Sequence, residues 1–396
     1  MAFPVKWIHS GMRGAPQLSG TAGTLIAALD AFLLNGFGQV TALSVTVSGG
    51  IATATLNAGQ SFDKHAVVLV EGATTPAALN GEARVLTATS SSITWATSAP
   101  DGAATGVVTI KVAPVGQWEK VFSAANKAVY RSTDTQGARF YYRVDDSGTT
   151  AARVRGYEAM SDVDTGTEPF PTDVQLNGGG YLTKSASANA TAVAYSLVGD
   201  SRAVLMAIAS ASSSNASYLA APVRGFGDAI ALATSGDLWA AMVSCATAAV
   251  QSNSYGSFDA CVSSPNLSIF VARPAGGIGS SVAVDARSWG SAGTITASSG
   301  ADTTMGALSS APNGRLFYSR RYITSGADLT PRANIPGVLY ISQSGVTASI
   351  APGDVVLGGG EMQGRLLLAV GNRQANTGLP SPVQGISLLD ISGPWR

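Results

Sequence analysis

Short runs of alternating apolar and polar residues, separated by glycine-rich turns, recur along most of this 396-residue chain. Alternation with a period of two is typical of β-strands that bury one face. The run VTALSVTVSGGIATATL (40–56) holds two such stretches around a Gly-Gly turn, which is a hairpin signal. Asn-Gly at 80–81 and Pro-Asp-Gly at 100–102 supply further turns. The pattern predicts a mainly β protein.

The turns and the runs between them divide the chain into four predicted segments. Residues 1–38 form an N-terminal arm and a short helix, and residues 39–115 a small antiparallel β domain of immunoglobulin-like or barrel type. Residues 116–177 form a middle hairpin or linker region, and residues 178–396 a larger antiparallel β-sandwich domain. No fixed-period repeat is visible, which argues against a solenoid or a propeller.

Residues 22–34 are the one stretch whose apolar side chains clearly recur at spacings of three and four, as on one face of a helix. Ser19 or Thr21 is expected to cap its start, and Asn35 and Gly36 to end it. A helix of about three and a half turns is unstable alone in water. Its apolar stripe must therefore pack on the sheets of this chain or on a neighbouring subunit.

The chain carries no formal net charge, and only 12% of its residues are charged. Such a surface lacks a general attraction to nucleic acid or to anionic lipid. A neutral free monomer would be prone to aggregation, which a subunit of a larger assembly avoids. We also expect no signal peptide and no membrane span. Cys245 and Cys261 are too few for a disulfide framework.

The sequence offers few side chains for catalysis. His9 and His65 are its only histidines, so a Ser-His-Asp triad would have to draw on the N-terminal part. We interpret His65 as a polar residue at a strand end, and His9 as either a contact with a partner chain or a catalytic residue. Two isolated histidines give no zinc site. We predict no enzymatic activity and no cofactor.

Asp162, Asp164 and Glu168 surround a glycine and are the candidate cation site. Alternating carboxylates at a turn can wrap a calcium ion, although the full twelve-residue loop pattern is absent. The alternative is a solvated turn whose carboxylates accept hydrogen bonds from backbone amides. Asp145 and Asp146 are interpreted as turn formers rather than a catalytic pair, because adjacent residues of a strand point to opposite faces.

Two further patterns are weaker indications of a ligand-binding site. Glycine triplets at 178–180 and 358–360 lack the spacing of a phosphate-binding loop. A pair of arginines flanked by tyrosines could stack on a base or a sugar, or could form an interface or a solvated strand face: Tyr318, Arg320, Arg321 and Tyr322.

Four stretches of the first 171 residues carry a resemblance to a known family. They are VKWIHSGMRGAPQLSGTAGTLIAALDAFLLNGFG (5–38), VLVEGATTPAALNGEARVLTATSSSITWATSAPDGAATGVVTIKVAP (68–114), WEKVFSAANKAVYRS (118–132) and YYRVDDSGTTAARVRGYEAMSDVDTGTEPFP (141–171). The order of these segments resembles uncharacterised virion structural proteins from tailed bacteriophages and prophages of GC-rich proteobacteria. The likeness is looser over the rest of the chain, to the closing DISGPWR. It implies a virion component assembled in the host cytoplasm, with no catalytic residues to carry over.

The leading hypothesis is a tail-associated structural protein, forming a homo-oligomeric ring or trimeric appendage with other virion proteins. The arm and helix would be its anchor, and the apolar residues expected to bury against a neighbour are Trp7, Leu25, Leu29, Phe32 and Leu33. A head decoration or collar protein is the alternative within the same class.

Two other classes of protein stay open. An adhesin that binds a host surface glycan would expose aromatic side chains, for which Trp239 and Trp289 are candidates. A glycan hydrolase needs two carboxylates roughly 5–10 Å apart in a groove. The acidic residues of the C-terminal half mostly sit beside glycine or serine in turns, which argues against it.

Overall fold

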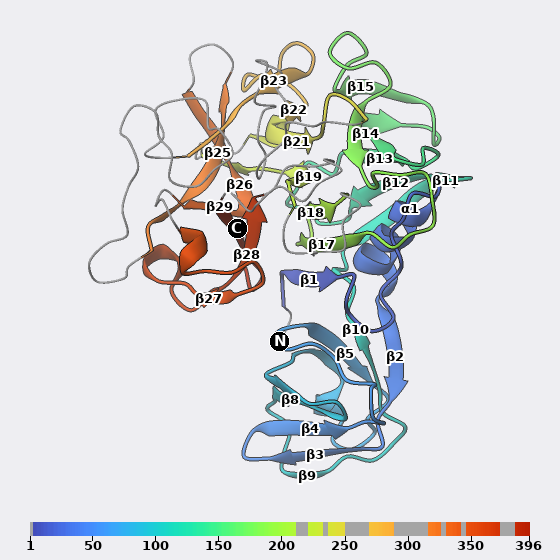
Figure 1. Ribbon diagram of the computed structural model, residues 1–396, viewed down its shortest axis with the longest axis vertical. Coiled ribbons are helices and arrows are strands. Elements are labelled where there is room, and N and C mark those ends of the chain that lie inside the picture. Colours follow the sequence, from blue (N-terminus) through green and yellow to red (C-terminus); the bar gives the residue numbers. More distant parts are fainter. Residues whose placement is uncertain are drawn as a thin grey trace.

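The computed structural model describes residues 3–210, 221–232, 237–249, 269–288, 316–325, 330–341, 346–372 and 385–396. Within this part of the chain the structure is mainly β, as predicted, and its strand pairs are antiparallel. The one α-helix described is α1 (Thr24–Asp30), which continues directly into a π-helical turn, η1 (Ala31–Asn35). Figure 1 shows a small β unit projecting from a larger body of strands.

The small unit is a sandwich of two sheets, and we call it the small sandwich (residues 37–112). One sheet has the order β2-β10-β5-β6, and the other has the order β7-β8-β4-β3-β9. The strands of the first are β2 (Phe37–Thr41), β5 (Val67–Glu71), β6 (Gly81–Arg84) and β10 (Thr109–Val112). The strands of the second are β3 (Ser44–Ser48), β4 (Ile51–Thr55), β7 (Thr87–Ala88), β8 (Ser92–Ala96) and β9 (Gly102–Ala103); a 3₁₀ turn, η2, covers Ala77–Leu79.

The remaining strands, with the arm and α1, form the main body. A six-stranded sheet has the order β11-β12-β13-β14-β15, with β16 also paired to β14. Its strands are β11 (Trp118–Ala124), β12 (Lys127–Ser132), β13 (Tyr141–Asp145), β14 (Ala151–Met160), β15 (Gly166–Phe170) and β16 (Gly180–Thr183). The region predicted as a middle hairpin or linker (116–177) therefore supplies five of the six strands of a sheet.

A second sheet of the main body has the order β1-β17-β18-β19-β21-β22-β23. Its strands are β1 (Lys6–His9), β17 (Ala194–Gly199), β18 (Ala203–Ala209), β19 (Val223–Asp228), β21 (Ala241–Ser244), β22 (Ile269–Val271) and β23 (Val282–Val284); η3 (Leu238–Ala240) is a 3₁₀ turn. Its side chains are buried along nearly all of β17 and β18. A near-continuous apolar run is typical of a strand covered on both faces.

The third sheet of the main body has the order β24-β25-β26-β29-β28-β27, with β20 paired to β26. We call it the C-terminal sheet. Its strands are β20 (Ile230–Ala231), β24 (Ala286–Ser288), β25 (Tyr318–Ser325), β26 (Thr330–Ile341), β27 (Val355–Leu357), β28 (Leu366–Asn372) and β29 (Gly385–Asp390). Two 3₁₀ turns, η4 (Val346–Ala348) and η5 (Gly360–Met362), complete this region.

Two of the predicted boundaries are crossed by strand pairing. β1 of the arm pairs along β17, with Lys6 opposite Gly199, so the arm belongs to a sheet of the main body. β16 pairs with β14 across the predicted boundary at 178. A single apolar core also runs from the small sandwich, through α1, into the sheets of the main body. The arm and the middle region are therefore integral parts of one packed structure.

Candidate functional site

The residues predicted to anchor the chain on a neighbour are buried in the chain itself. Leu29, Phe32 and Leu33 have no exposed surface, Leu25 is 1% exposed and Trp7 is 8% exposed. Predicting that they bury against another subunit was therefore wrong. The apolar stripe was read correctly, but the sheets of the same chain cover it. These side chains are therefore not available for contact with a partner.

The start of α1 is capped by a residue from far along the chain. Its N-cap position is Gly23, and neither Ser19 nor Thr21 caps the helix, because their hydroxyls bond to each other. The backbone amide of Leu25 donates instead to a carboxylate oxygen of Asp146, at 2.7 Å. Unsatisfied amides at a helix start favour such an anion.

Asp146 forms a buried ion pair with Lys184, and neither side chain is exposed to solvent. The ammonium of Lys184 also donates to the backbone carbonyl of Thr21, at 2.7 Å. Burial raises the pKa of the Asp146 carboxyl, and the hydrogen bonds from Lys184 and the helix amides oppose that change. The prediction that Asp146 serves only as a turn former therefore missed its main role, which is to join the arm, β13 and the segment after β16.

The three residues of the candidate cation site do not converge on one point. Asp162 accepts hydrogen bonds from the backbone amides of Asp164 and Thr165, each at 2.8 Å. The carboxylate of Asp164 pairs with Lys127 and Arg143. Glu168 lies 3.8 Å from the guanidinium of Arg273. Among the residues that the structure describes, no group of three metal-ligating side chains is present. The cation-site hypothesis is therefore replaced by the alternative of a hydrogen-bonded turn.

The structure describes the surroundings of both histidines. His9 is 3% exposed, its Nε2 lies 2.8 Å from a carboxylate oxygen of Asp63, and its Nδ1 accepts a hydrogen bond from the amide of Gly11. Because both ring nitrogens are engaged within the chain and the side chain is buried, the interpretation of His9 as a contact with a partner chain, one of the two alternatives, is wrong. His65 adopts a positive φ of 70°, and burial lowers its pKa.

The arginine and tyrosine cluster is divided between buried side chains and side chains that line a cleft. Arg321 is buried, with its guanidinium 5.8 Å from the ring centre of Tyr340, and Tyr322 is 7% exposed. Tyr318 and Arg320 instead line a cleft, described below. A bulge between Arg320 and Tyr322 interrupts the pairing with β26 at this point.

The glycine triplet at 178–180 serves close packing. A Cβ on Gly180 would lie 2.1 Å from the sulfur of Cys245, so only glycine fits there. Cys245 is a free, buried thiol, and burial raises its pKa to about 12. Such a thiol is inert as a nucleophile. Cys261 lies outside the described residues.

Trp239 is not an open platform for a glycan. Its ring stacks on Phe140 at a centroid distance of 5.8 Å, and the guanidinium of Arg273 lies 4.9 Å from its centroid. Gly277 approaches the same indole so closely that a Cβ there would lie 2.4 Å from Nε1. Trp289, the second aromatic candidate, lies outside the described residues.

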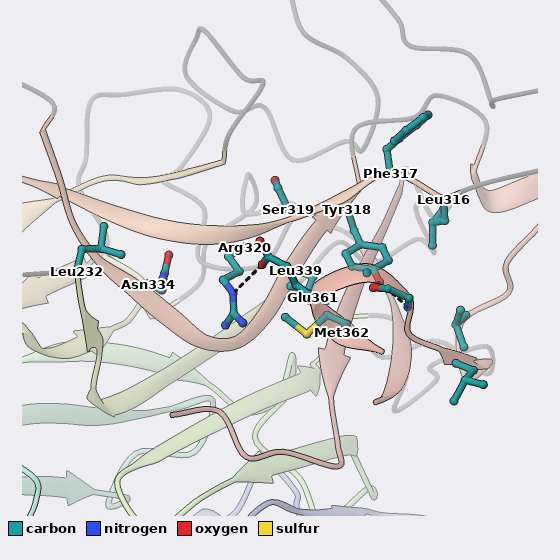
Figure 2. Close-up of a pocket in the computed structure, with 14 residues that line it drawn as sticks. Leu232, Leu316, Phe317, Tyr318, Ser319, Arg320, Asn334, Leu339, Glu361 and Met362 are labelled. Carbon is teal, nitrogen blue, oxygen red and sulfur yellow. Dashed lines mark hydrogen bonds and ion pairs between the residues drawn. The ribbon is translucent and has the colours of Figure 1, made fainter. Parts of the chain in front are cut away.

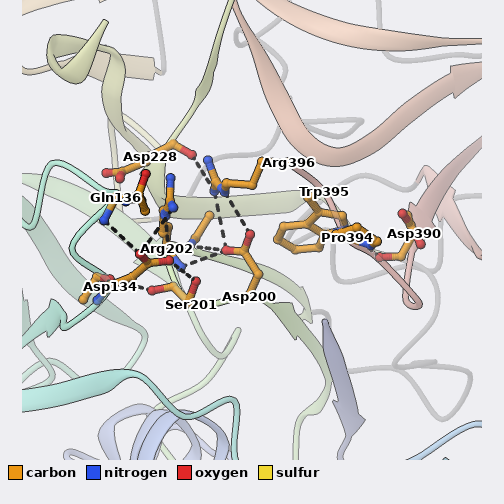
Figure 3. A network of polar contacts seen from close by, with 12 residues as sticks. Asp134, Gln136, Asp200, Ser201, Arg202, Asp228, Asp390, Pro394, Trp395 and Arg396 are labelled. Carbon is orange, nitrogen blue, oxygen red and sulfur yellow. Dashed lines mark hydrogen bonds and ion pairs between the residues drawn. The ribbon is translucent and has the colours of Figure 1, made fainter. Parts of the chain in front are cut away.

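A network of charged groups joins the last residues of the sequence to the main body (Figure 3). Arg396 pairs with Asp200 at 3.0 Å and donates to the backbone carbonyl of Asp228, also at 3.0 Å. Arg202, two residues after Asp200, pairs with Asp134 at 2.8 Å. These carboxylates are held by arginines and backbone amides, which gives the network a structural role.

Two acids of this region, Asp134 and Asp228, have opposite pKa shifts. Burial alone would raise the pKa of Asp134, but hydrogen bonds from Arg202, Ser201 and a backbone amide outweigh it and lower the pKa to about 2. Burial raises the pKa of Asp228, although the amide of Ala138 donates to its carboxylate at 2.9 Å. A pair of acids with separated pKa values can mark an acid–base site. Here both carboxylates are occupied by hydrogen-bond donors.

A cleft of about 940 Å³ opens on the C-terminal sheet. Figure 2 shows side chains from β25, β26 and η5 lining it. Its polar residues include Arg320, Glu361 and Asn334, together with Ser319 and Tyr318. Phe317 and Leu357 are among its apolar residues. A cleft of this size with a few polar groups is the usual form of a small-molecule site. The sequence suggested it only through the arginine and tyrosine cluster.

The exposed apolar side chains form a second feature. Ten large apolar side chains are exposed among the described residues, and four of these belong to the small sandwich: Leu43, Ile51, Leu86 and Val107. Leu43 and Val107 are 63% and 72% exposed. They flank the hydrogen bond between Ala42 and Val108 and so lie at neighbouring positions.

No protein-family model matches the chain, and no curated protein matches it. In the part of the chain that the structure describes, helices with the length and apolar character required to cross a membrane are absent.

Proposed function

We propose that this chain is a structural, non-catalytic component of a tailed bacteriophage virion, associated with the tail as part of a homo-oligomeric ring or appendage. The small sandwich, instead of the arm and helix, makes the contact with neighbouring virion proteins. The observation that carries this proposal is the exposure of Leu43 and Val107 on a projecting unit. Exposed apolar residues that cluster on a surface often mark protein–protein contacts.

The charge arrangement supports a structural role. Ion pairs of the main body, such as Asp146–Lys184 and Arg332–Asp237, lie within the chain and bury their side chains. His9 is likewise engaged within the chain, through Asp63 and the amide of Gly11. The resemblance of the first 171 residues to virion structural proteins supports the same class of function. A head decoration or collar position stays the alternative.

The proposal is tested on particles of a phage that encodes the chain. We expect the protein in purified virions by mass spectrometry, and antibody label on the tail by electron microscopy. Label on the head would favour the decoration alternative, and a chain absent from particles would refute the virion role.

The contact surface is tested by the double change Leu43→Asp and Val107→Asp. We expect at least a tenfold loss of the protein from particles without a change in its melting temperature. Val174→Asp is the matched control, because Val174 is 99% exposed and lies in the main body. Normal incorporation of the double variant would show that another surface makes the contact.

A further inference from the structure

The outer strands of the small sandwich differ in how they are protected. A strand at the edge of a sheet presents N–H and C=O groups that can pair with another chain, unless it is short, charged or covered. Two outer strands, β7 and β9, have two residues each. A third, β6, is covered by the arm, since Lys6 pairs with Glu82 and the amide of Phe3 donates to the same carboxylate. The fourth, β2, has five residues and carries neither a charge nor a proline.

The backbone of β2 directs hydrogen-bonding groups away from the sheet. The amide of Ala42 donates to the carbonyl of Val108 in the chain before β10, at 2.9 Å, and Val40 is the next residue that faces β10 in this register. Hydrogen bonding alternates along an antiparallel pair, so Gln39 and Thr41 turn their N–H and C=O groups to the other side. No hydrogen bond within the part of the chain that the structure describes engages these four groups. Figure 1 shows β2 at the margin of the small sandwich.

The free part of this edge is bounded at both ends. The guanidinium of Arg13, in the arm, donates to the carbonyl of Gly38 and so covers the start of β2. Beyond the other end, the amide of Leu43 donates to the carbonyl of Thr55, at 2.8 Å. The side chains of Gln39 and Thr41 between these points are exposed. The free edge is therefore a short, uncharged stretch with two outward-facing residues.

We propose that this edge of β2 pairs with the same edge of a second copy of the chain, antiparallel and about a two-fold axis beside Val40. Gln39 of each copy then lies opposite Thr41 of the other. All four outward groups of each copy find a partner in this register, because opposed residues of such a pair exchange both of their hydrogen bonds. The two four-stranded sheets join edge to edge into one sheet.

A second copy fits this edge because the edge is complementary to itself. A two-fold interface brings the same patch together from both subunits, so any charge on it would meet its own like. The stretch from Phe37 to Leu43 has no charged residue, so two copies bring no like charges together there. Leu43, 63% exposed, directly follows the edge, and the added strand covers part of it. This inference rests on the proposed contact through the small sandwich and names its partner.

The test is sedimentation equilibrium of the full chain with charges placed on the edge. One variant carries Gln39→Lys with Thr41→Lys, and the other carries Gln39→Glu with Thr41→Glu. We expect the unchanged protein to dimerise as its concentration rises. Each variant alone should dimerise at least tenfold more weakly, because like charges then lie opposite each other. An equal mixture of the two variants should form heterodimers, because the opposed charges then attract.

Control variants and a second measurement separate this edge from the rest of the surface. Thr46→Lys with Ser48→Lys, and the matching pair of glutamates, have the same spacing at exposed positions of β3, in the other sheet. These variants should dimerise like the unchanged protein. In the dimer, amide hydrogen exchange should slow at Gln39 and Thr41 but not at Val40, whose amide already faces β10.

The inference is overturned if the protein stays monomeric at every concentration reached, if the charged variants dimerise normally, or if their mixture forms no heterodimer. The particle experiment keeps this result apart from the proposed function. A monomeric chain whose Leu43→Asp and Val107→Asp variant is lost from particles would refute the pairing and support the proposed contact with another virion protein. A dimer that is absent from particles would support the pairing and refute the virion role.

Discussion

The small sandwich and the main body use charge in different ways. No ion pair joins two residues of the small sandwich, all of whose residues the structure describes, and two of its acids, Glu82 and Asp63, pair with Lys6 and His9 of the arm. The main body is joined internally by ion pairs between distant segments, including the fully buried pair of Asp146 and Lys184. The small sandwich relies on hairpins and an apolar core, whereas the main body also depends on buried charges.

This difference has a consequence for how each region tolerates change. Apolar burial depends on area, and neighbouring side chains can adjust to a loss. A buried ion pair that loses one partner leaves an uncompensated charge away from water. The main body should therefore respond more sharply than the small sandwich to the loss of a single charged partner. The following four predictions probe the two regions, from the largest expected effect to the smallest.

The largest effect is expected from the same substitution made in both regions. Leu29→Asp places a charge where the side chain has no exposed surface, and we expect a loss of about 4–5 kcal/mol or more in the free energy of unfolding. Leu43→Asp, at a position 63% exposed in the small sandwich, should change it by less than about 0.5 kcal/mol. Urea unfolding of both variants measures the difference. Equal effects would show that α1 is not part of the core.

How far the sequence predicts the fold also differs between the regions. The alternating runs around Gly49 and Gly50 predicted the hairpin of β3 and β4, because register there is set by adjacent residues. The periodicity of residues 22–34 predicted the helix, and Gly36 ends it with a φ of 66°. The sequence predicts such local elements well, because the partner strand of a hairpin follows directly along the chain and a helix needs no partner strand.

The sequence could not show what covers the helix or what caps it. An apolar stripe requires burial but does not say against which surface. Asp146 stands in an Asp-Asp-Ser-Gly turn and looks like any turn former, while its partner Lys184 lies 38 residues farther along the chain. No local signal links the two. The cleft was equally hidden, because Arg320, Asn334 and Glu361 meet only through the topology of the C-terminal sheet.

The second prediction concerns that buried pair. Asp146→Ala leaves the ammonium of Lys184 buried without its carboxylate, and it also removes the acceptor for the amide of Leu25. We expect a loss of about 3–5 kcal/mol in the free energy of unfolding. Asp145→Ala is the control, because Asp145 pairs with Arg143 near the surface and should cost about 1 kcal/mol or less.

The double change Asp146→Leu with Lys184→Met sharpens this result. Replacing both partners by apolar residues removes the uncompensated charge, so the double variant should be more stable than Asp146→Ala. If Asp146→Ala unfolds at the same urea concentration as the unchanged protein, the pair contributes nothing to the stability of the main body.

The third prediction concerns acid. The pKa of Asp134 is lowered to about 2 in the folded protein, below the value of about 3.9 expected in the unfolded chain. A lowered pKa contributes stability that is fully present above the unfolded value and is lost as pH falls toward the folded one. As the pH falls from about 4 to about 2, the Asp134→Asn variant should therefore lose about 1–2 kcal/mol less stability than the unchanged protein. Unfolding curves measured at several pH values across this range test it, and a slope equal to that of the unchanged protein would contradict it.

The smallest effect is expected where the two regions meet. Asp63 is 42% exposed and holds His9 through one hydrogen bond of 2.8 Å, so Asp63→Ala should cost only about 0.5–1.5 kcal/mol. Lys6 still pairs with Glu82 and donates to the carbonyl of Val115, so the regions stay joined. Amide hydrogen exchange should therefore quicken near residues 61–65 and at the arm, while the amides of β17 and β18 exchange as before. Faster exchange throughout the main body would mean that this contact, rather than the shared apolar core, holds the two regions together.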